Sequence, residues 1–198
     1  MRNIISFLLF FLINFTLSAN LNLDSLKNLW NNTSLPDTSR LNAVNEIAKS
    51  YLNLDMPDSA LCFAKFQYDF SVAISNKKQM AKALNYQGNA YSKQSNFDKS
   101  LACSNKSIKI KQEIGDLKNL SSIYISIGNV YACKGDNTKG LEYYKMALDN
   151  SLDNNNVQAA VFNNMGSLCR RQGNYEQAII YYKRSLKLKK TIGDKKGI

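Results

Sequence analysis

The chain of 198 residues contains no histidine, only two prolines and only one tryptophan. Without histidine it has no Ser-His or Cys-His nucleophile and no imidazole ligand for a metal ion. It also has no Gly-rich phosphate loop, and its few glutamates are far apart in the sequence. Pro36 and Pro57 fall where helices would have to break, so the stretches between turns are free to be helical. These shortages predict an all-helical, non-catalytic chain with no cofactor.

Cysteine is present, but not in a pattern that binds metal. The four residues are 41, 30 and 36 positions apart and form no CxxC pair: Cys62, Cys103, Cys133 and Cys169. Disulfides are common in exported chains, so pairing of some cysteines stays open. Cys169 stands where matching segments have tyrosine, which predicts a buried apolar residue.

The first residues contain the longest apolar run, from Ile4 to Leu17. Its 14 residues are fewer than the roughly 17–25 that a membrane-spanning helix needs. A short positive head precedes the run and Ser18-Ala19 follows it, which is the order of a secretory signal peptide. We therefore expect a signal peptide at 1–19 and export to the periplasm or the extracytoplasmic face of a bacterial membrane. An uncleaved anchor is the alternative.

The net charge is +11, and lysine and arginine are concentrated in the residues after Cys169. On helices such residues mainly form solvated faces, although an acidic partner or an anionic membrane surface would also fit them. Nucleic-acid binding is an alternative for a basic chain, and it predicts an affinity that falls steeply with salt. Export argues against nucleic acid as a partner. Nucleic-acid binding would require that the first residues are not a leader.

Three glycines, Gly88, Gly128 and Gly166, lie in similar surroundings at spacings of 40 and 38 residues. A repeat of this period indicates stacked supersecondary units, each too small to bury its own apolar face. A glycine inside a helix costs about 1 kcal/mol relative to alanine, so we expect each to let a neighbouring helix approach closely. Gly135 and Gly173, each before a turn, are predicted to end helices in a left-handed conformation.

The repeat divides the chain into successive segments. A short helix and a turn are expected at 20–37, where Leu23, Leu26 and Trp30 follow helical spacing and would pack on the first repeat. The repeats that follow are 38–76 (degenerate, without the glycine), 77–116, 117–156 and 157–194, and 195–198 would begin a further, truncated repeat.

The fourth repeat reads Phe162-x2-Met165-Gly166-x2-Cys169, then Ala178-x3-Tyr182. This resembles the W-x2-L-G-x2-Y…A-x3-F pattern of tetratricopeptide repeats, in a variant of about 40 residues with longer helices. The resemblance implies an all-α, right-handed α-solenoid of stacked helical hairpins, used for protein–protein interaction. The chain departs from the family pattern, because it lacks the tryptophan and the closing proline of the repeat.

The first helix of each hairpin lines the concave side of such a solenoid, where a protein or peptide ligand would bind. Helical spacing from the glycines places Asn85, Asn163, Lys93 and Arg170 on this groove. In similar repeat proteins an asparagine just after the glycine contacts peptides, and the resemblance carries that role to Asn89 and Asn129. The alternative is that these asparagines only reflect an Asn-rich composition.

The layout of leader, short helix and long repeats resembles the amino-terminal sensing region of bacterial membrane signalling proteins, such as sensor histidine kinases. The expectation is that the sequence is part of such a protein, with membrane association only through a missing C-terminal segment or an uncleaved leader. A free-standing periplasmic adaptor is the alternative, and it could dimerise through an uncovered C-terminal end.

Overall fold

The computed structural model describes residues 22–117, 120–151 and 154–193, and this part of the chain contains no β-strand. A helix at 22–31 comes first. Eight labelled helices follow: α2 (Asp37–Asn53), α3 (Pro57–Ala73), α4 (Lys77–Lys93), α5 (Phe97–Glu113), α6 (Ser121–Cys133), α7 (Asn137–Asp149), α8 (Asn155–Arg171) and α9 (Tyr175–Thr191). The predicted all-α fold is confirmed. The predicted signal peptide and the residues from 195 onwards lie outside the described part.

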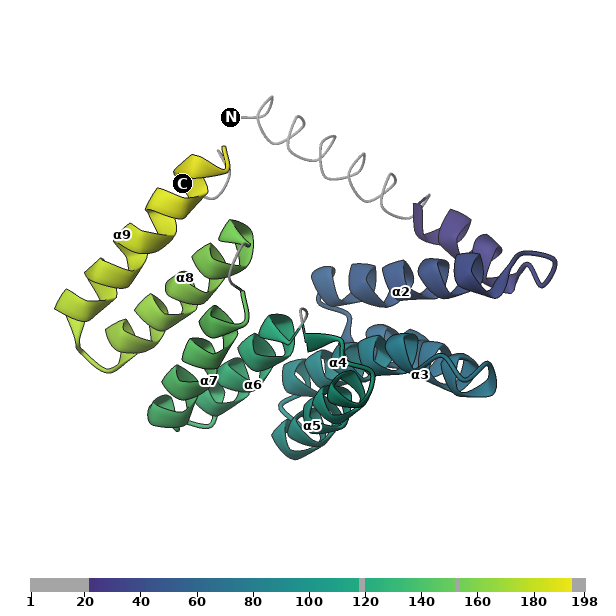
Figure 1. Ribbon diagram of the computed structural model, residues 1–198, viewed down its shortest axis with the longest axis horizontal. Helices are drawn as coiled ribbons and strands as arrows, with labels where there is room; N and C mark the ends of the chain where they lie inside the picture. Colours follow the sequence, from purple (N-terminus) through teal and green to yellow (C-terminus); the bar gives the residue numbers. More distant parts are fainter. Residues whose placement is uncertain (1–21, 118–119, 152–153, 194–198) are drawn as a thin grey trace, which may run out of the picture.

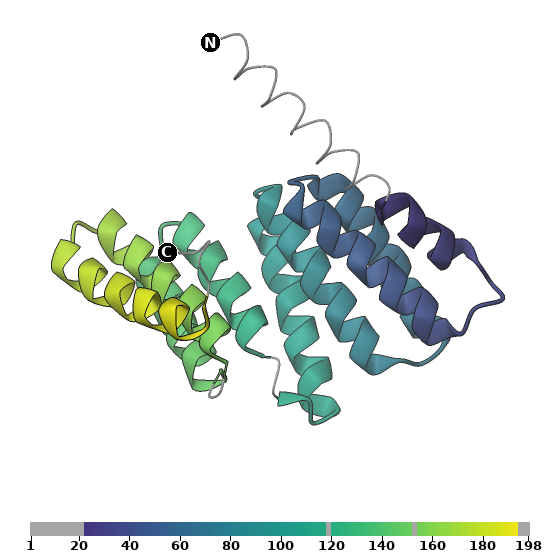
Figure 2. The same ribbon diagram turned by 90° about the horizontal axis from the view of Figure 1, so that it is seen from above.

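The helices form four antiparallel hairpins that stack into an arch (Figure 1). The first helix of each hairpin (α2, α4, α6, α8) lies on the inner side of the arch, and the second (α3, α5, α7, α9) lies on the outer side. Seen from above, the hairpins follow one another along the array (Figure 2). None of the helices in the described part is long and apolar enough to cross a bilayer.

Four of the turns share one geometry. After α3, α4, α6 and α8, a residue with positive φ follows the helix end, and then an Asn or Asp side chain caps the next helix. After α4, Ser95 has φ 58° and its N–H bonds to the carbonyl of Ser92, while the N–H of Asn96 bonds to the carbonyl of Tyr91. This is the Schellman arrangement. The left-handed conformations expected of Gly135 and Gly173 are confirmed, with φ 84° and 77°.

Ser95 is a residue that the turn does not favour. The left-handed region costs an L-residue roughly 1–2 kcal/mol, a cost that glycine avoids. Ser95→Gly is therefore expected to raise the free energy of unfolding by about 0.5–1 kcal/mol, since glycine's larger unfolded-state entropy offsets part of the gain. Urea denaturation followed by circular dichroism measures it. Gly135→Ser, the reverse change in the next hairpin, should destabilise, and a gain there would contradict this account.

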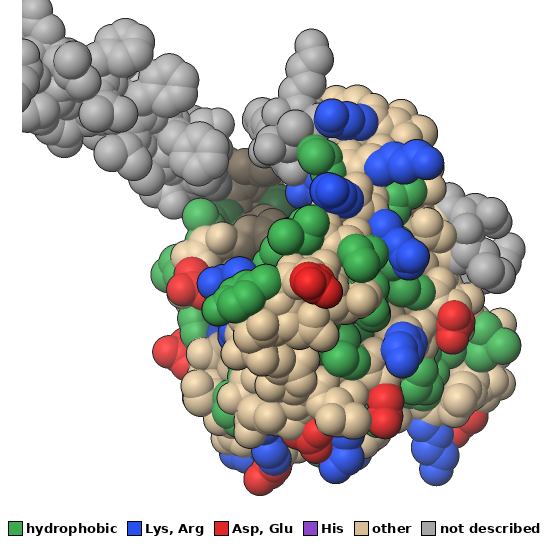
Figure 3. All heavy atoms as spheres, turned by 90° about the vertical axis from the view of Figure 1, so that its left-hand side faces the viewer, with side chains coloured by type: hydrophobic (Ala, Val, Ile, Leu, Met, Phe, Trp, Pro, Cys, Tyr) green, Lys and Arg blue, Asp and Glu red, His purple; other side chains and the backbone are tan. Residues whose placement is uncertain are grey.

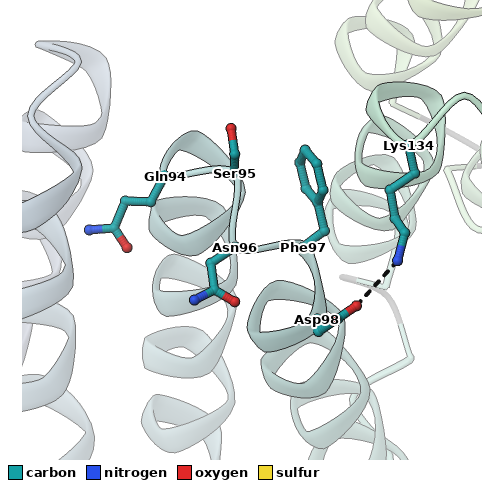
Figure 4. A pocket seen from close by; sticks show the side chains of 6 residues that line it. All are labelled: Gln94, Ser95, Asn96, Phe97, Asp98 and Lys134. Carbon is teal, nitrogen blue, oxygen red and sulfur yellow. Dashed lines mark hydrogen bonds and ion pairs between the residues drawn. The ribbon is translucent and has the colours of Figure 1, made fainter.

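The same turn holds a contact between hairpins (Figure 4). Asp98, in the first turn of α5, pairs with Lys134 at the end of α6 over 3.2 Å. One hairpin earlier, Asp58 accepts a 2.6 Å hydrogen bond from Gln94. The two contacts occupy equivalent positions of successive repeats, 40 residues apart. Each joins the second helix of one hairpin to the first helix of the next.

The glycines inside the first helices do allow close helix packing, as predicted. A Cβ on Gly128 would lie 2.6 Å from the Tyr144 ring, and one on Gly166 would lie 2.8 Å from the Tyr182 ring. In the second hairpin the facing residue is Ser104, whose Oγ would be 3.1 Å from a Cβ on Gly88. The two later hairpins therefore pack a tyrosine ring on the glycine, whereas the second packs a small side chain.

The core differs along the array. The third and fourth hairpins share an apolar cluster that includes Ile123, Ile127, Met165 and Leu168. The first two hairpins bury polar residues as well, namely Asn45, Gln67, Ser71, Gln87, Ser100, Ser104, Ser107 and Lys111. Some are satisfied locally: Ser107 donates a 2.7 Å hydrogen bond to the carbonyl of Ala81. Among the described residues, the amino-terminal half therefore buries more polar side chains than the other half.

The helix at 22–31 packs on the first hairpin, as predicted. Trp30 meets Phe70 edge to face at 5.4 Å, and the Arg40 guanidinium lies over both rings. Arg40 also donates a hydrogen bond to the Trp30 carbonyl over 3.1 Å. Leu23 is buried. This helix covers the amino-terminal end of the array.

All four cysteines lie in the described part and are free. Cys169 is buried, as its place in the repeat predicts, and burial raises its pKa. Cys62 and Cys133 are exposed. The buried Cys169 therefore acts as an apolar packing residue in α8.

Candidate peptide-binding groove

A groove of about 540 Å³ lies across the inner helices of the first three hairpins. Every lining residue belongs to α2, α4 or α6: Lys49, Leu52, Asn53, Tyr86, Asn89, Ser92, Lys93, Ser126 and Asn129. Among the predicted site residues, Asn89, Lys93 and Asn129 meet here. The groove is therefore built only from first helices, on the side where the sequence predicted a ligand surface.

The lining residues occupy repeated positions. The lining residues of α4 lie at positions −2, +1, +4 and +5 relative to Gly88. The lining residues of α2 and α6 lie at offsets from the same set, counted from Ala48 and Gly128. Tyr86, Asn89 and Lys93 are spaced i, i+3, i+7, which forms one stripe on a helix. Successive hairpins place these stripes side by side, so a ligand running along the array would meet similar residues in each helix.

The asparagines at the +1 position differ in their surroundings. Asn89 makes no side-chain hydrogen bond to any described residue, and no tyrosine stands opposite it because that position is Ser104. A free primary amide offers two donors and one acceptor oxygen, which suits a peptide backbone group.

Asn129 is held in place. Its Oδ1 accepts a 2.6 Å hydrogen bond from the Tyr144 hydroxyl and a 3.3 Å bond from the Asn164 amide. Burial raises the pKa of Tyr144 to about 12, so its hydroxyl keeps its proton at neutral pH and donates. With the oxygen of Asn129 occupied, its amide nitrogen is the group left to donate to a ligand.

The tyrosine is a positioning residue for Asn129. Tyr144→Phe would remove the 2.6 Å hydrogen bond but keep the ring against Gly128. We expect a loss of about 1 kcal/mol in unfolding free energy and a weaker hold on the Asn129 amide. Differential scanning calorimetry measures the unfolding free energy. A change in the NMR chemical shift of the Asn129 side-chain amide reports the weaker hold. Tyr143→Phe is the matched control, and an equal shift in that variant would contradict the assignment.

The two lysines of the groove are already paired with acidic groups. Lys93 contacts Asp55 over 2.6 Å, and Lys49 contacts Glu46 over 3.3 Å. All four side chains are well exposed, and such pairs are worth little in water. A ligand carboxylate could therefore replace either partner at small cost. Tyr86 between them has a raised pKa, first from burial and then from the charge of Glu46.

Three predicted residues do not join this groove. Asn163 lines a separate hollow of about 290 Å³ between α8 and the end of α9. Arg170 is exposed at the +4 position of α8, beyond the three helices that form the groove. Asn85 lies at −3, and its Oδ1 is buried without a hydrogen-bond partner in the described part. A residue at −3 points about 100° away from one at −2, which turns it toward the neighbouring helices.

Sequence reasoning missed Tyr86, Ser126 and Lys49. The stripe i, i+3, i+7 through Asn89 would have found Tyr86, and its equivalent in α6 would have found Ser126. The prediction placed the residue three before each glycine on the groove, whereas the residue two before it lines the groove, so both were missed. Lys49 stood in a repeat without the glycine marker, and only the 40-residue register connects it with Asn89.

The stacked hairpins and the inner groove define a helical-repeat solenoid. The profile described as "Tetratricopeptide repeat" matches residues 79–153 and 119–191, which together exceed half of the chain. The chain belongs to the tetratricopeptide repeat family. The fold serves as a protein–protein interaction scaffold and is in general non-catalytic.

Solved structures of low sequence identity share the fold. The Rap conjugation gene regulator of plasmid pLS20, solved in complex with the Phr* peptide, superimposes with a TM-score of 0.80 at 16% identity, over 93% of this chain and 51% of that one. A Rap protein complexed with competence and sporulation factor gives 0.80 at 14% identity, over 93% and 52%. This chain therefore spans about half the length of each of these two proteins.

One curated relative is much longer than this chain. The human protein O-mannosyl-transferase TMTC1 is 34% identical over 98 residues, which is 50% of this chain and 10% of that protein. A match to a tenth of an enzyme carries over no catalytic activity. That this chain itself lacks enzymatic activity stays a prediction.

Proposed function

We propose that this chain binds an extended segment of another protein in the groove between α2, α4 and α6. The observation that carries the proposal is the convergence of Asn89, Lys93 and Asn129 on one open groove. The structural neighbours solved with the Phr* peptide and with competence and sporulation factor have the same fold, which supports a ligand of this kind. The amides hold backbone groups, and the lysines receive an acidic side chain of the ligand.

Peptides selected from a random phage-displayed library against the full chain provide the test. We expect Asn89→Ala and Asn129→Ala each to weaken binding of a selected peptide roughly three- to tenfold, since each removes one or two hydrogen bonds. Isothermal titration calorimetry measures the affinity. Asn163→Ala is the matched control, because Asn163 lies in the other hollow. Unchanged affinity in the Asn89→Ala, Asn129→Ala double variant would refute the groove as the site.

We further propose that the chain acts outside the cytoplasm, as the sensory region of a membrane signalling protein of the histidine-kinase or transcription-regulator type. The leader-like residues 1–19 and the resemblance to such sensing regions support this. A STAND protein with a tetratricopeptide repeat sensor shares the fold, at a TM-score of 0.66 and 17% identity, and this chain covers 26% of it.

Immunoblotting of fractionated cells with an antibody to the repeats tests this second proposal. A membrane-bound band far above 22.3 kDa is expected. A periplasmic band slightly below that mass would instead indicate a free-standing adaptor, and a cytoplasmic band would refute export.

A further inference from the structure

The inner helices of the array hold almost no acidic residues. There is none in α4, α6 or α8, and α2 contains only Asp37 and Glu46. Every outer helix contains at least one. On the face of the molecule at its α9 end, acidic side chains lie among basic ones (Figure 3). The acidic groups that can act on a ligand in the groove are therefore few.

Positive charge is distributed unevenly along the groove. Lys49 and Lys93 line its α2 and α4 walls. The α6 wall contributes Ser126 and Asn129, and α6 has no charged residue. A ligand carboxylate would therefore be attracted to the α2–α4 end of the groove, whereas the α6 end offers neutral hydrogen-bonding groups.

The acidic partner of Lys49 is held by a buried network. Glu46 Oε1 accepts a 3.2 Å hydrogen bond from the side-chain amide of Asn45, which is itself buried. The Asn45 side-chain oxygen accepts a 3.4 Å bond from Gln67, which is completely buried. The Gln67 amide also donates to Gln79 over 3.2 Å. Displacing the Glu46 carboxylate would leave the Asn45 amide without this acceptor, so Glu46 stays beside Lys49.

The acidic partner of Lys93 has no such support. Asp55 lies in the turn between α2 and α3 with φ 57°, and its side chain is 80% exposed. Among the described residues its carboxylate contacts only Lys93, over 2.6 Å. An exposed pair of this kind is worth little in water, so exchanging Asp55 for another carboxylate costs little. Of the two groove lysines, Lys93 is therefore the one that a ligand acid can take over.

We propose that Asp55 is a built-in competitor, which occupies the place of a ligand carboxylate on Lys93. This inference rests on the proposed function of the groove, and it specifies the ligand as an extended segment with an Asp or Glu over the α2–α4 end and neutral residues over α6. When the segment binds, Lys93 exchanges the Asp55 carboxylate for that of the ligand, while Glu46 stays with Lys49. Asp55 thereby sets the specificity of the groove, because it opposes acidic segments and leaves neutral ones unaffected.

A peptide selected from the phage-displayed library on the full chain tests the proposal, together with a neutral copy in which each Asp and Glu is changed to Asn or Gln. Isothermal titration calorimetry should show tighter binding of the acidic peptide. Asp55→Asn should strengthen that binding about two- to fivefold, the range that one exposed ion pair allows, and should leave the neutral copy unchanged. Asparagine tolerates the left-handed conformation of Asp55, so the turn should be kept.

Two further variants complete the experiment. Lys93→Met should remove the advantage of the acidic peptide over its neutral copy, because no cation then faces the ligand carboxylate. Asp98→Asn is the matched control, since it breaks a similar exposed pair between hairpins, with Lys134, outside the groove. It should change the affinity for neither peptide.

The results distinguish this inference from the proposed function. If the Asn89→Ala, Asn129→Ala double variant binds the peptide as tightly as the unchanged chain, the groove is not the site and both proposals fail. If the double variant binds weakly but Asp55→Asn has no effect, only the competitor role of Asp55 is refuted. Weaker binding to Asp55→Asn would refute it as well, since Asp55 would then hold the ligand. A selected peptide without Asp or Glu would refute the acidic ligand.

Discussion

Gly128→Ala is expected to lower the free energy of unfolding by about 1–3 kcal/mol, the usual range for overpacking a core. The added Cβ would lie 2.6 Å from the Tyr144 ring and 3.2 Å from the carbonyl oxygen of Gly140. The ring can move only by disturbing the apolar cluster, because Tyr144 belongs to it. This range is the net effect: alanine's better helix propensity, worth about 1 kcal/mol, acts against the clash and is smaller than it. Urea denaturation followed by circular dichroism measures the change.

The second hairpin provides the matched comparison. At Gly88 the nearest atom is the flexible Ser104 hydroxyl at 3.1 Å, so Gly88→Ala should cost less than Gly128→Ala. Tyr144→Ser alone recreates the Gly/Ser pairing of the second hairpin, and its combination with Gly128→Ala gives the Ala/Ser pairing of Gly88→Ala. The two changes should be non-additive, with the alanine costing less once the ring is gone. Full additivity would contradict a direct clash with Tyr144.

This packing also reaches the candidate site. The Tyr144 hydroxyl holds Asn129 in the groove, so a ring displaced by Gly128→Ala would also displace the Asn129 amide. Binding of a groove peptide should therefore weaken in Gly128→Ala more than in Gly88→Ala. Repeat glycines thus influence the ligand surface through the helix behind it.

Several parts of the fold could be predicted because they depend on spacing alone. The 40-residue register gave stacked hairpins, and the glycines at Gly88, Gly128 and Gly166 gave the close helix contacts. The same register placed Asn89, Lys93 and Asn129 on inner helices. These features follow from helical periodicity and from the missing side chain of glycine, both of which are visible in a sequence.

Other features depend on distances between helices, which spacing does not contain. The bond between Tyr144 and Asn129 requires the angle between α6 and α7. The left-handed Ser95 was not predictable from its residue type, which glycine would suit better. The pair between Asp55 and Lys93 joins residues 38 positions apart, and only the stacking of the first two hairpins brings them together.

A buried ion pair near the end of α5 leads to the other large expected effect. The Lys111 ammonium lies 2.8 Å from an Asp116 carboxylate oxygen, with side chains 6% and 19% exposed. Lys111→Met keeps most of the apolar stem but leaves the carboxylate without this partner. Breaking a buried pair costs roughly 3–5 kcal/mol, so a loss of about 2–4 kcal/mol is expected in chemical denaturation for this slightly wetter one.

The matched control is Lys109→Met, two residues earlier on an exposed position, which should change stability little. Lys111→Met combined with Asp116→Asn removes both charges and should recover part of the loss, because the carboxylate charge that Lys111 balanced is then gone as well. Since Asp116 lies in the linker between α5 and α6, the loss should appear first as local opening at this junction. Amide hydrogen exchange should therefore become faster at the end of α5 and the start of α6 than in the rest of the array. Uniform quickening across all four hairpins would show instead that the pair stabilises the chain as a whole.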